Sequence, residues 1–207
     1  MTVSEHIEVL KQTVRANGTE LYSEQRGSLG LLPLLSQVLE QVTIPVLAAG
    51  GIGSPRALAG VLAAGAAGAR CGTRFVAAKE SAAHPIYVEA LIRARAEDAV
   101  RTTLYHVGCP LCPSTHGVLN SAIQAAEVHA GDIVGELEMA GQTVPIARFH
   151  GLPPSKAITG HVERMALYAG QSVGNVHAIQ PAAEIVAELV GGPVGRPFAA
   201  AGRTETA

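Results

Sequence analysis

The chain has 207 residues, of which 48% are hydrophobic and 15% are charged, and its formal net charge is −2. So small a net charge gives no reason to expect a nucleic-acid partner or a charged membrane surface. No stretch approaches the ~20 consecutive apolar residues of a membrane span, and the first residues lack the pattern of a secretory leader. Three cysteines do not make a disulfide framework, so we expect a protein of the reducing cytoplasm.

The N-terminal part of the chain predicts two helices and a short strand. We expect a helix over residues 4–12, a strand over 13–17 that ends at Gly18, and a second helix over 29–42. Leucine and valine recur at helical spacing in the last segment, which indicates a helix packed against a sheet.

Residues 44–76 alternate strand-like and helix-like segments. Residues 44–49 are an apolar run of strand length, and the glycine-rich turn 50–53 ends it. Ser54 is a favourable N-cap and Pro55 suits the first position of a helix. The Ala- and Leu-rich residues that follow should continue this helix.

A second glycine turn repeats this arrangement. The predicted strand 68–71 ends at Gly72 and Thr73, where the next helix begins. Turns that follow adjacent parallel strands point the same way, and their backbone N–H groups can share one phosphate. We therefore predict a phosphate site at Gly50, Gly51, Gly72 and Thr73. The alternative is a plain βαβ crossover, in which the glycines only make tight turns.

A dinucleotide-binding turn is a weaker interpretation of the same residues. The sequence from Gly51 begins like G-x-G-x-x-G, but Arg56 replaces the third glycine, where close helix–strand packing excludes a large side chain. The acidic residue expected about twenty positions later is also missing, because Arg70 stands there.

Longer motifs carry a resemblance to a known family. The segments PVLAAGGIG and GTRFVAAKESAAHPIYVEAL resemble the nitronate monooxygenases, formerly called 2-nitropropane dioxygenases, and the related flavin-dependent enoyl-ACP reductase II. Both are FMN-binding (β/α)8 barrels. The segment MALYAGQSVGNVHAIQPAAEIVAELV, residues 165–190, is similar to the C-terminal signature of nitronate monooxygenases specifically. The resemblance implies FMN as cofactor, and an alkyl nitronate and O2 as substrates.

The loop after Gly18 is where the resemblance implies a catalytic base. The similar enzymes carry a pattern close to G-x-E-A-G-G-H-x-R-G, whose His is the base, and Glu24 stands at its place in this chain. A carboxylate can act as a base if burial raises its pKa; the alternative is a solvated loop residue. Asn17 stands where the family has a flavin-contacting Gln.

The resemblance assigns three more residues to the flavin. Arg70 lies where the family often has Gln or Arg facing the flavin. Tyr168 and Gln171, in the YAGQS segment, would contact cofactor or substrate. The alternative for this segment is a helix-capping glycine turn with Gln171 on the surface.

The number of predicted strands limits the fold. We count about three parallel strands, whereas a closed barrel of this type needs eight, in typically ~250 residues. We therefore predict an α/β fold with a partial (β/α)8 TIM barrel in residues 1–100, a mainly helical region in 101–190, and a disordered tail in 191–207. Three alternatives follow from the small number of strands. The chain is a truncated relative, or it completes its sheet with a partner chain, for example in a homo-oligomer, or it folds into a reduced α/β layer. The alternative functions are an enoyl-ACP reductase II-like flavoprotein and a non-catalytic flavin- or phosphate-binding remnant.

The region after residue 77 predicts further elements. They are a helix over 81–96, an extended segment over 102–107, a helix over 118–129, a hairpin over 138–149 with its turn at Ala140 and Gly141, a helix over 161–168, and a helix over 181–190.

A cysteine- and histidine-containing loop lies between two of these elements. His106, Cys109, Cys112 and His116 have near metal-ligand spacing, and a C-x2-C pair beside two histidines could bind zinc. Two prolines stiffen the loop, however, and no second C-x2-C pair appears. We therefore expect a proline-rich loop with incidental thiols and no metal.

Overall fold

A computed structural model describes residues 30–109, 112 and 115–191 of the chain. The helices and strands are α2 (Leu31–Leu39), β1 (Leu47–Ala49), α3 (Pro55–Ala63), β2 (Gly68–Arg70), α4 (Thr73–Val76), α5 (Pro85–Arg93), β3 (Ala99–Thr102), β4 (His116–Leu119), α6 (Asn120–Glu127), β5 (Ile133–Met139), β6 (Gln142–Ala147), β7 (Ile158–Gly160) and α7 (Ala182–Gly191). Three 3-10 helices are η1 (Ala96–Asp98), η2 (Val162–Arg164) and η3 (Gln171–Asn175). The predictions for residues 1–29 and 192–207, which include Asn17 and Glu24, lie outside the described residues.

The unit formed by β1, α3, β2 and α4 folds as predicted. β1 and β2 pair in parallel, and α3 begins at Pro55 after the N-cap Ser54, whose Oγ accepts a hydrogen bond from the Ala57 N–H at 3.2 Å. Gly65, just past the end of α3, has a φ of +103°, the left-handed conformation that favours glycine there. Under this unit lies a buried cluster of Leu35, Ala48, Ile52, Val61 and Ala66.

The structure is α/β, as predicted, but the described residues form three separate small sheets and no closed barrel. β1 pairs with β2, β3 pairs antiparallel with β4, and β5 lies between β6 and β7. The prediction of a mainly helical region in 101–190 was wrong, because strands from β3 to β7 run through it. β3, β4 and β7 have only three or four residues. The pairs β3–β4 and β5–β7 each join segments separated by a long connection, so these pairings left no local periodic signal.

The predicted hairpin is confirmed. β5 and β6 pair antiparallel, with Met139 opposite Gln142. Ala140 and Gly141 make the two-residue turn with φ values of +52° and +77°, which is the sign pattern of a type I′ turn.

Three predicted helices have different bounds. The helix expected over 81–96 is α5, which begins only after His84, whose Nδ1 accepts a hydrogen bond from the Ile86 N–H. The helix expected over 118–129 is α6, which begins later than predicted because residues 118 and 119 belong to β4. Of residues 161–168, which were expected to form a helix, only those of η2 are helical.

Backbone pairing explains the last of these differences. The residues after η2 lie against β4, where the Leu119 N–H donates to the Leu167 carbonyl and the Ala169 N–H donates to the Gly117 carbonyl, both at 2.9 Å. These bonds hold residues 167–169 extended despite their helix-favouring sequence.

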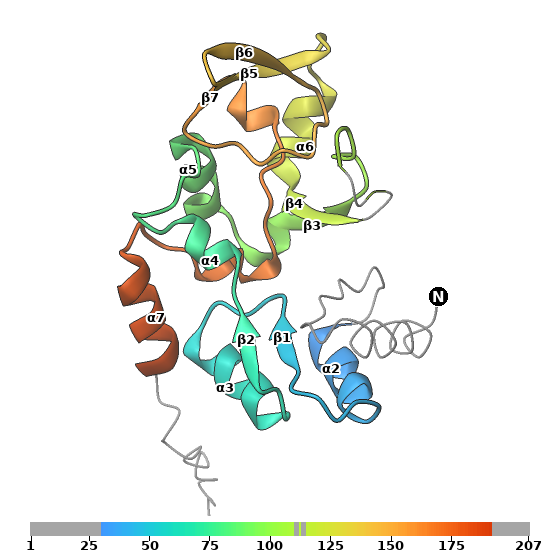
Figure 1. The fold of residues 1–207 in the computed structure, drawn as a ribbon, viewed down its shortest axis with the longest axis vertical. Coiled ribbons are helices and arrows are strands. Elements are labelled where there is room, and N and C mark those ends of the chain that lie inside the picture. Colours follow the sequence, from blue (N-terminus) through green and yellow to red (C-terminus); the bar gives the residue numbers. More distant parts are fainter. Residues whose placement is uncertain (1–29, 110–111, 113–114, 192–207) are drawn as a thin grey trace, which may run out of the picture.

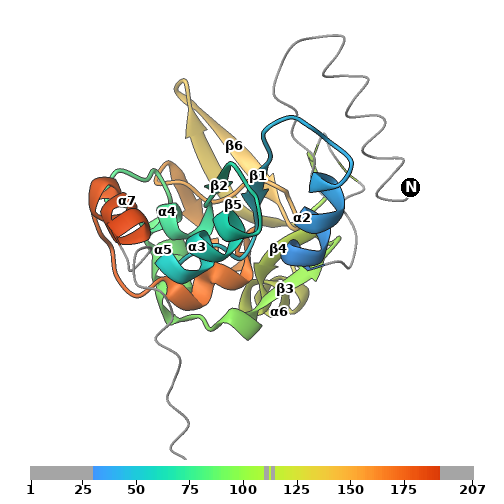
Figure 2. The same cartoon turned by 90° about the horizontal axis from the view of Figure 1, so that it is seen from below.

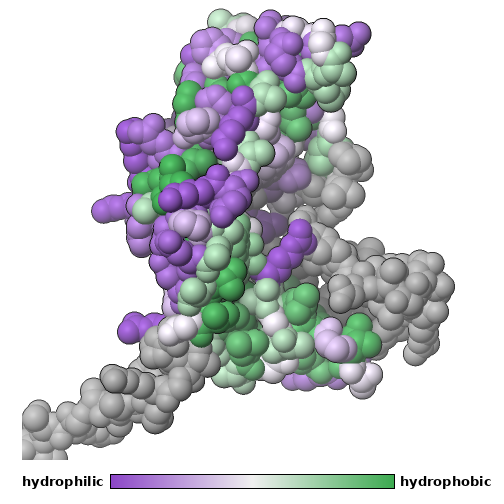
Figure 3. All heavy atoms as spheres, turned by 60° about the vertical axis from the view of Figure 1, so that its left-hand side comes forward, coloured by the Kyte–Doolittle hydropathy of each residue, from purple (hydrophilic) through white to green (hydrophobic). Residues whose placement is uncertain are grey.

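The molecule is elongated, with β1, β2, α2 and α3 at one end and β5, β6 and β7 at the other (Figure 1). The chain returns at its C-terminal end, so that α7 lies beside α3 and α4 (Figure 2). Ile185 and Leu189 of α7 pack with Ala78, Leu58 and Phe75 there. Apolar side chains gather in the lower part of the face shown in Figure 3, and α3 and α7 keep Leu62, Val186 and Val190 exposed. No helix in the described ranges is both long and apolar enough to span a bilayer.

Candidate functional site

The two glycine turns, residues 50–53 and 72–73, lie at one edge of the parallel sheet. Because β1 and β2 are parallel neighbours, with Ala49 opposite Arg70, the residues that follow both strands emerge at the same end. Gly50 and Gly51 have φ values of +108° and +70°, so glycine suits both positions for conformational reasons.

The space above these turns is open on the protein side. Among residues 30–109, 112 and 115–191, no heavy atom lies within 4 Å of a Cβ placed on Gly50, Gly51 or Gly72. Gly72 is the informative position, because its φ of −102° is available to any residue. Neither backbone conformation nor packing against the described residues accounts for glycine at Gly72, whereas the close approach of a ligand would.

A third segment, residues 168–172, meets both turns. The Gly170 N–H donates a hydrogen bond to Thr73 Oγ1 at 3.0 Å. A Cβ built on Gly170 would lie 3.7 Å from Thr73 Oγ1, 3.9 Å from Ser172 Oγ and 4.0 Å from the Gly51 nitrogen. Two hydroxyl oxygens and a backbone nitrogen therefore lie within 4.0 Å of one point.

The first glycine turn fits closely against η3. A Cβ on Gly53 would come within 2.9 Å of Ser172 Cβ and 3.1 Å of the Ser172 carbonyl oxygen. This contact fixes the position of Ser172 relative to α3, so the three segments form one rigidly spaced group of hydrogen-bond donors.

The chemistry of this group suits an anion. Backbone N–H groups and hydroxyls donate hydrogen bonds without carrying charge, and α3 adds the partial positive charge of its N-terminus beside the first turn. A phosphate group matches such a donor set.

The predicted site residues are only partly brought together. Gly51 and Thr73 lie at the common point, whereas Arg70 is exposed at the end of β2 and Gln171 is exposed at the start of η3. The Tyr168 hydroxyl donates a hydrogen bond to the Gly151 carbonyl at 2.8 Å. Contacts of Arg70, Tyr168 and Gln171 with a cofactor remain predictions.

Gly170 and Ser172 were missed by the sequence interpretation, which selected their neighbours. Ser172 is one of two buried polar or charged residues among the described ones; the other is Arg74. No local pattern in Gly170-Gln171-Ser172 signals this role, because the residues that they approach belong to distant segments.

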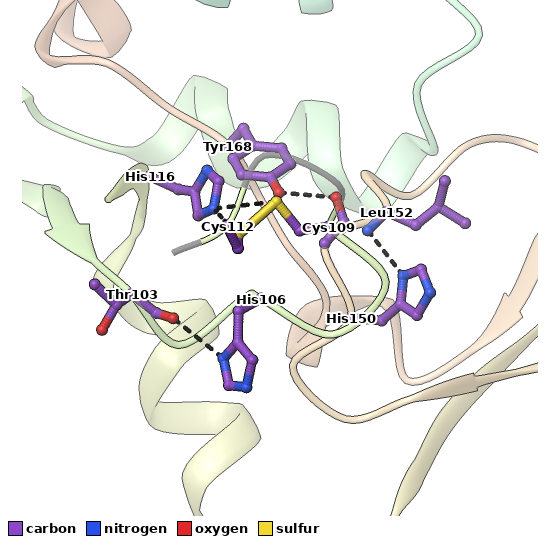
Figure 4. The surroundings of a disulfide bond; sticks show 9 residues. Thr103, His106, Cys109, Cys112, His116, His150, Leu152 and Tyr168 are labelled. Atoms are coloured by element: carbon purple, nitrogen blue, oxygen red, sulfur yellow. Dashed lines mark hydrogen bonds between the residues drawn. A yellow bond between two sulfur atoms is a disulfide. The ribbon is translucent and has the colours of Figure 1, made fainter. Parts of the chain in front are cut away.

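The loop between β3 and β4 holds a second cluster. Cys109 and Cys112 are joined by a disulfide, so the interpretation of incidental thiols was wrong. His116 Nε2 lies 3.3 Å from Cys112 Sγ and 4.0 Å from Cys109 Sγ, and these three residues have the donor atoms and spacing to hold a metal ion. His106 does not join them, because its Nδ1 contacts the Thr103 carbonyl at 3.2 Å (Figure 4).

Comparisons with known proteins identify the family of the chain. The family model described as nitronate monooxygenase matches residues 16–192. Nitronate monooxygenase npaC of Metarhizium robertsii is 32% identical over 189 residues, which are 86% of this chain and 49% of that protein. A probable nitronate monooxygenase of Bacillus subtilis is 26% identical over 160 residues, or 75% of this chain and 42% of the relative.

Among solved structures, FabK from Thermotoga maritima superposes with a TM-score of 0.54 at 25% identity, covering 80% of this chain and 49% of FabK. The chain thus spans about half the length of the curated relatives it matches. Since the family model extends over most of its residues, the chain belongs to the nitronate monooxygenase family.

Proposed function

We propose that this chain carries the phosphate-binding part of an FMN site, in a flavin oxidoreductase that oxidises alkyl nitronates with O2. The observation that supports it is that the Gly51 nitrogen, Thr73 Oγ1 and Ser172 Oγ lie within 4.0 Å of one point, the Cβ position built on Gly170, at the edge of two parallel strands. The unit from β1 to α4 then corresponds to two of the eight repeats of a (β/α)8 barrel, where phosphate sites follow the last strands.

Each residue of the site would contribute to phosphate binding in its own way. The Gly51 N–H and the Thr73 and Ser172 hydroxyls would donate hydrogen bonds to phosphate oxygens, and Gly50 and Gly72 would let the phosphate approach the backbone. FMN, when bound, supplies the two-electron chemistry between nitronate and oxygen.

The remaining predicted residues would act at the flavin ring. Glu24 would serve as the base that takes the substrate proton. Asn17, Arg70, Tyr168 and Gln171 would contact the flavin or the substrate. We expect a small-molecule enzyme of the cytoplasm that works as a homo-oligomer or with a further part of the barrel.

FMN and riboflavin titrations of two variants test the phosphate assignment. Gly72→Ala adds a methyl group at a position with no atom of the described part of the chain within 4 Å, so the fold should tolerate it. We expect it to weaken FMN binding about tenfold, or ~1.4 kcal/mol. Riboflavin, which lacks the phosphate, should bind Gly72→Ala and the unmodified chain equally, as followed by flavin fluorescence.

Gly60→Ala is the matched control. Gly60 lies within α3 and also has open space around its Cβ position, so this variant should leave FMN affinity unchanged. Equal FMN affinity in both variants would contradict the phosphate site.

A non-catalytic flavin-binding module is the second candidate function. It is favoured by the β1–β2 sheet, which has only two strands among the described residues. Nitronate-dependent oxygen uptake by the FMN-loaded chain separates the two, since only the enzyme consumes oxygen.

A further inference from the structure

We propose that Cys109, Cys112 and His116 form a redox-active dithiol–disulfide site that exchanges with low-molecular-weight thiols. The two cysteines stand in a C-x2-C arrangement in the loop before β4, with Cα atoms 5.6 Å apart, and are joined by a disulfide. Both residues are half-buried, so neither belongs to the closed core.

His116 distinguishes the two sulfurs. Its Nε2 is 3.3 Å from Cys112 Sγ but 4.0 Å from Cys109 Sγ. An imidazole beside a sulfur stabilises the thiolate, which is the form that leaves when a disulfide is opened. Cys112 is therefore the leaving group, and Cys109 is the sulfur that an incoming thiolate attacks.

Neighbouring residues hold the imidazole in place. His116 begins β4 and is paired in register with Thr102 of β3. Its ring contacts the edge of the Tyr168 ring, with centroids 5.6 Å apart, and the Tyr168 hydroxyl is in turn bonded to the Gly151 carbonyl (Figure 4). The ring therefore stays beside the sulfurs when the disulfide opens.

The exchange balances with two thiols as reductant. One thiolate attacks Cys109 Sγ, the S–S bond breaks, and Cys112 leaves as a thiolate beside His116. A second thiolate then attacks the external sulfur of the mixed disulfide and releases Cys109. Two small thiols are oxidised to one disulfide, the Cys109–Cys112 disulfide is reduced to a dithiol, and the two protons of the reductant end on the protein sulfurs.

A purely structural role explains the bond less well. A disulfide restricts the unfolded chain more when it closes a longer loop, and this one closes a separation of only three positions. The third cysteine, Cys71, is of a different kind, because it is a free thiol packed beside apolar side chains, and burial raises its pKa. Cys71 therefore serves as an internal reference for reactivity.

Alkylation of the full chain in dithiothreitol buffers of set dithiol-to-disulfide ratio tests the site. After trapping with N-ethylmaleimide, mass spectrometry should show Cys109 and Cys112 protected together under oxidising ratios and labelled together under reducing ones. Labelling of Cys71 after unfolding should be the same under both. A Cys109–Cys112 disulfide that stays closed in the native protein at every dithiothreitol ratio would overturn the proposal.

Two histidine variants test the role assigned to the imidazole. His116→Gln should slow opening of the disulfide by glutathione about tenfold, because the leaving thiolate loses its stabilising neighbour. The matched control is His106→Gln, since His106 is exposed in the same loop and faces Thr103 instead of the sulfurs; its rate should equal that of the unmodified chain.

Two further results would overturn the proposal. Equal opening rates in the two histidine variants would remove His116 from the site. One zinc ion per chain, protecting both sulfurs from alkylation until a chelator is added, would show instead a metal centre with two thiolates and one imidazole.

Discussion

The hydroxyl oxygen of Thr73 accepts a hydrogen bond from the backbone N–H of Gly170, at 3.0 Å and across 97 residues of sequence. This bond joins the turn after β2 to the segment that leads into η3. It uses one lone pair of the hydroxyl and leaves its proton as a donor for a ligand. One side chain thus supports both the fold and the candidate phosphate site.

Replacing Thr73 separates these two roles. Thr73→Val keeps the shape but leaves the Gly170 N–H without its acceptor, so we expect a loss of about 1 kcal/mol in the free energy of unfolding and weaker FMN binding. Thr73→Ser keeps the hydroxyl and should preserve both. Urea unfolding and FMN titration measure the two effects, and a Thr73→Val variant that matches Thr73→Ser in both would disprove this account.

The close contact between Gly53 and Ser172 predicts an overpacked variant. In Gly53→Ala the new Cβ would lie 2.9 Å from Ser172 Cβ and 3.1 Å from its carbonyl oxygen, so we expect destabilisation of about 1–3 kcal/mol. Adding Ser172→Gly removes the nearer atom and should recover part of the loss, as a double-mutant cycle in urea would measure. Strictly additive effects would mean that the two positions do not touch.

The ion pair between α4 and α7 predicts a dependence of stability on acid. The Gln180 side chain and the Arg74 guanidinium both donate to the Glu188 carboxylate, and these hydrogen bonds lower its pKa from the ordinary value of 4.5. Because the pKa is lower in the folded protein, this stabilisation is complete above the ordinary value and is lost as the pH falls through the folded one.

Thermal unfolding as a function of pH measures this contribution. Glu188→Gln should be less stable than the unmodified chain at neutral pH, and the difference should shrink as the pH falls below 4.5. Gln180→Ala should reduce the same acid dependence, because its hydrogen bond is the largest cause of the shift. A difference that stays constant with pH would contradict the assignment.

A buried tyrosine supports the segment that carries Gly170. Tyr87, on α5, is 3% exposed and donates a hydrogen bond to the Tyr168 carbonyl, and its burial raises the pKa of the phenol, so the hydroxyl remains a donor at neutral pH. Tyr87→Phe leaves that carbonyl without this donor and should lower the free energy of unfolding by about 1–2 kcal/mol. Tyr105→Phe is a useful comparison, since the Tyr105 hydroxyl makes a longer bond of 3.3 Å and should cost less.

The part of the fold that the sequence predicted correctly depends on neighbours in the chain. Ser54 and Pro55 begin α3, Gly65 ends it, and Ala140 and Gly141 turn the β5–β6 hairpin; each acts through its own backbone conformation or a partner within a few residues. The extended segment near Leu167 was wrongly predicted as helix. Its hydrogen bonds go to β4, almost fifty residues earlier, so its neighbours in the chain do not indicate them.

The candidate site likewise contains residues that the sequence indicated and residues that it did not. Gly51 and Thr73 could be assigned because each follows a predicted strand, and parallel strands bring their ends together. Gly170 and Ser172 could not, since nothing near them in the sequence indicates the turn that they contact. Their role follows from packing between distant segments, which a motif of one segment does not encode.

The bond from Gly170 to Thr73 also sets an order of assembly during synthesis. Chain elongation proceeds at ~5–20 residues per second, so the 97 positions between these residues take roughly 5–20 s to make. Both glycine turns leave the ribosome well before Ser172 exists. A nascent chain therefore carries β1, α3 and β2 without the third side of their anion site, and it should acquire affinity for FMN only late in translation.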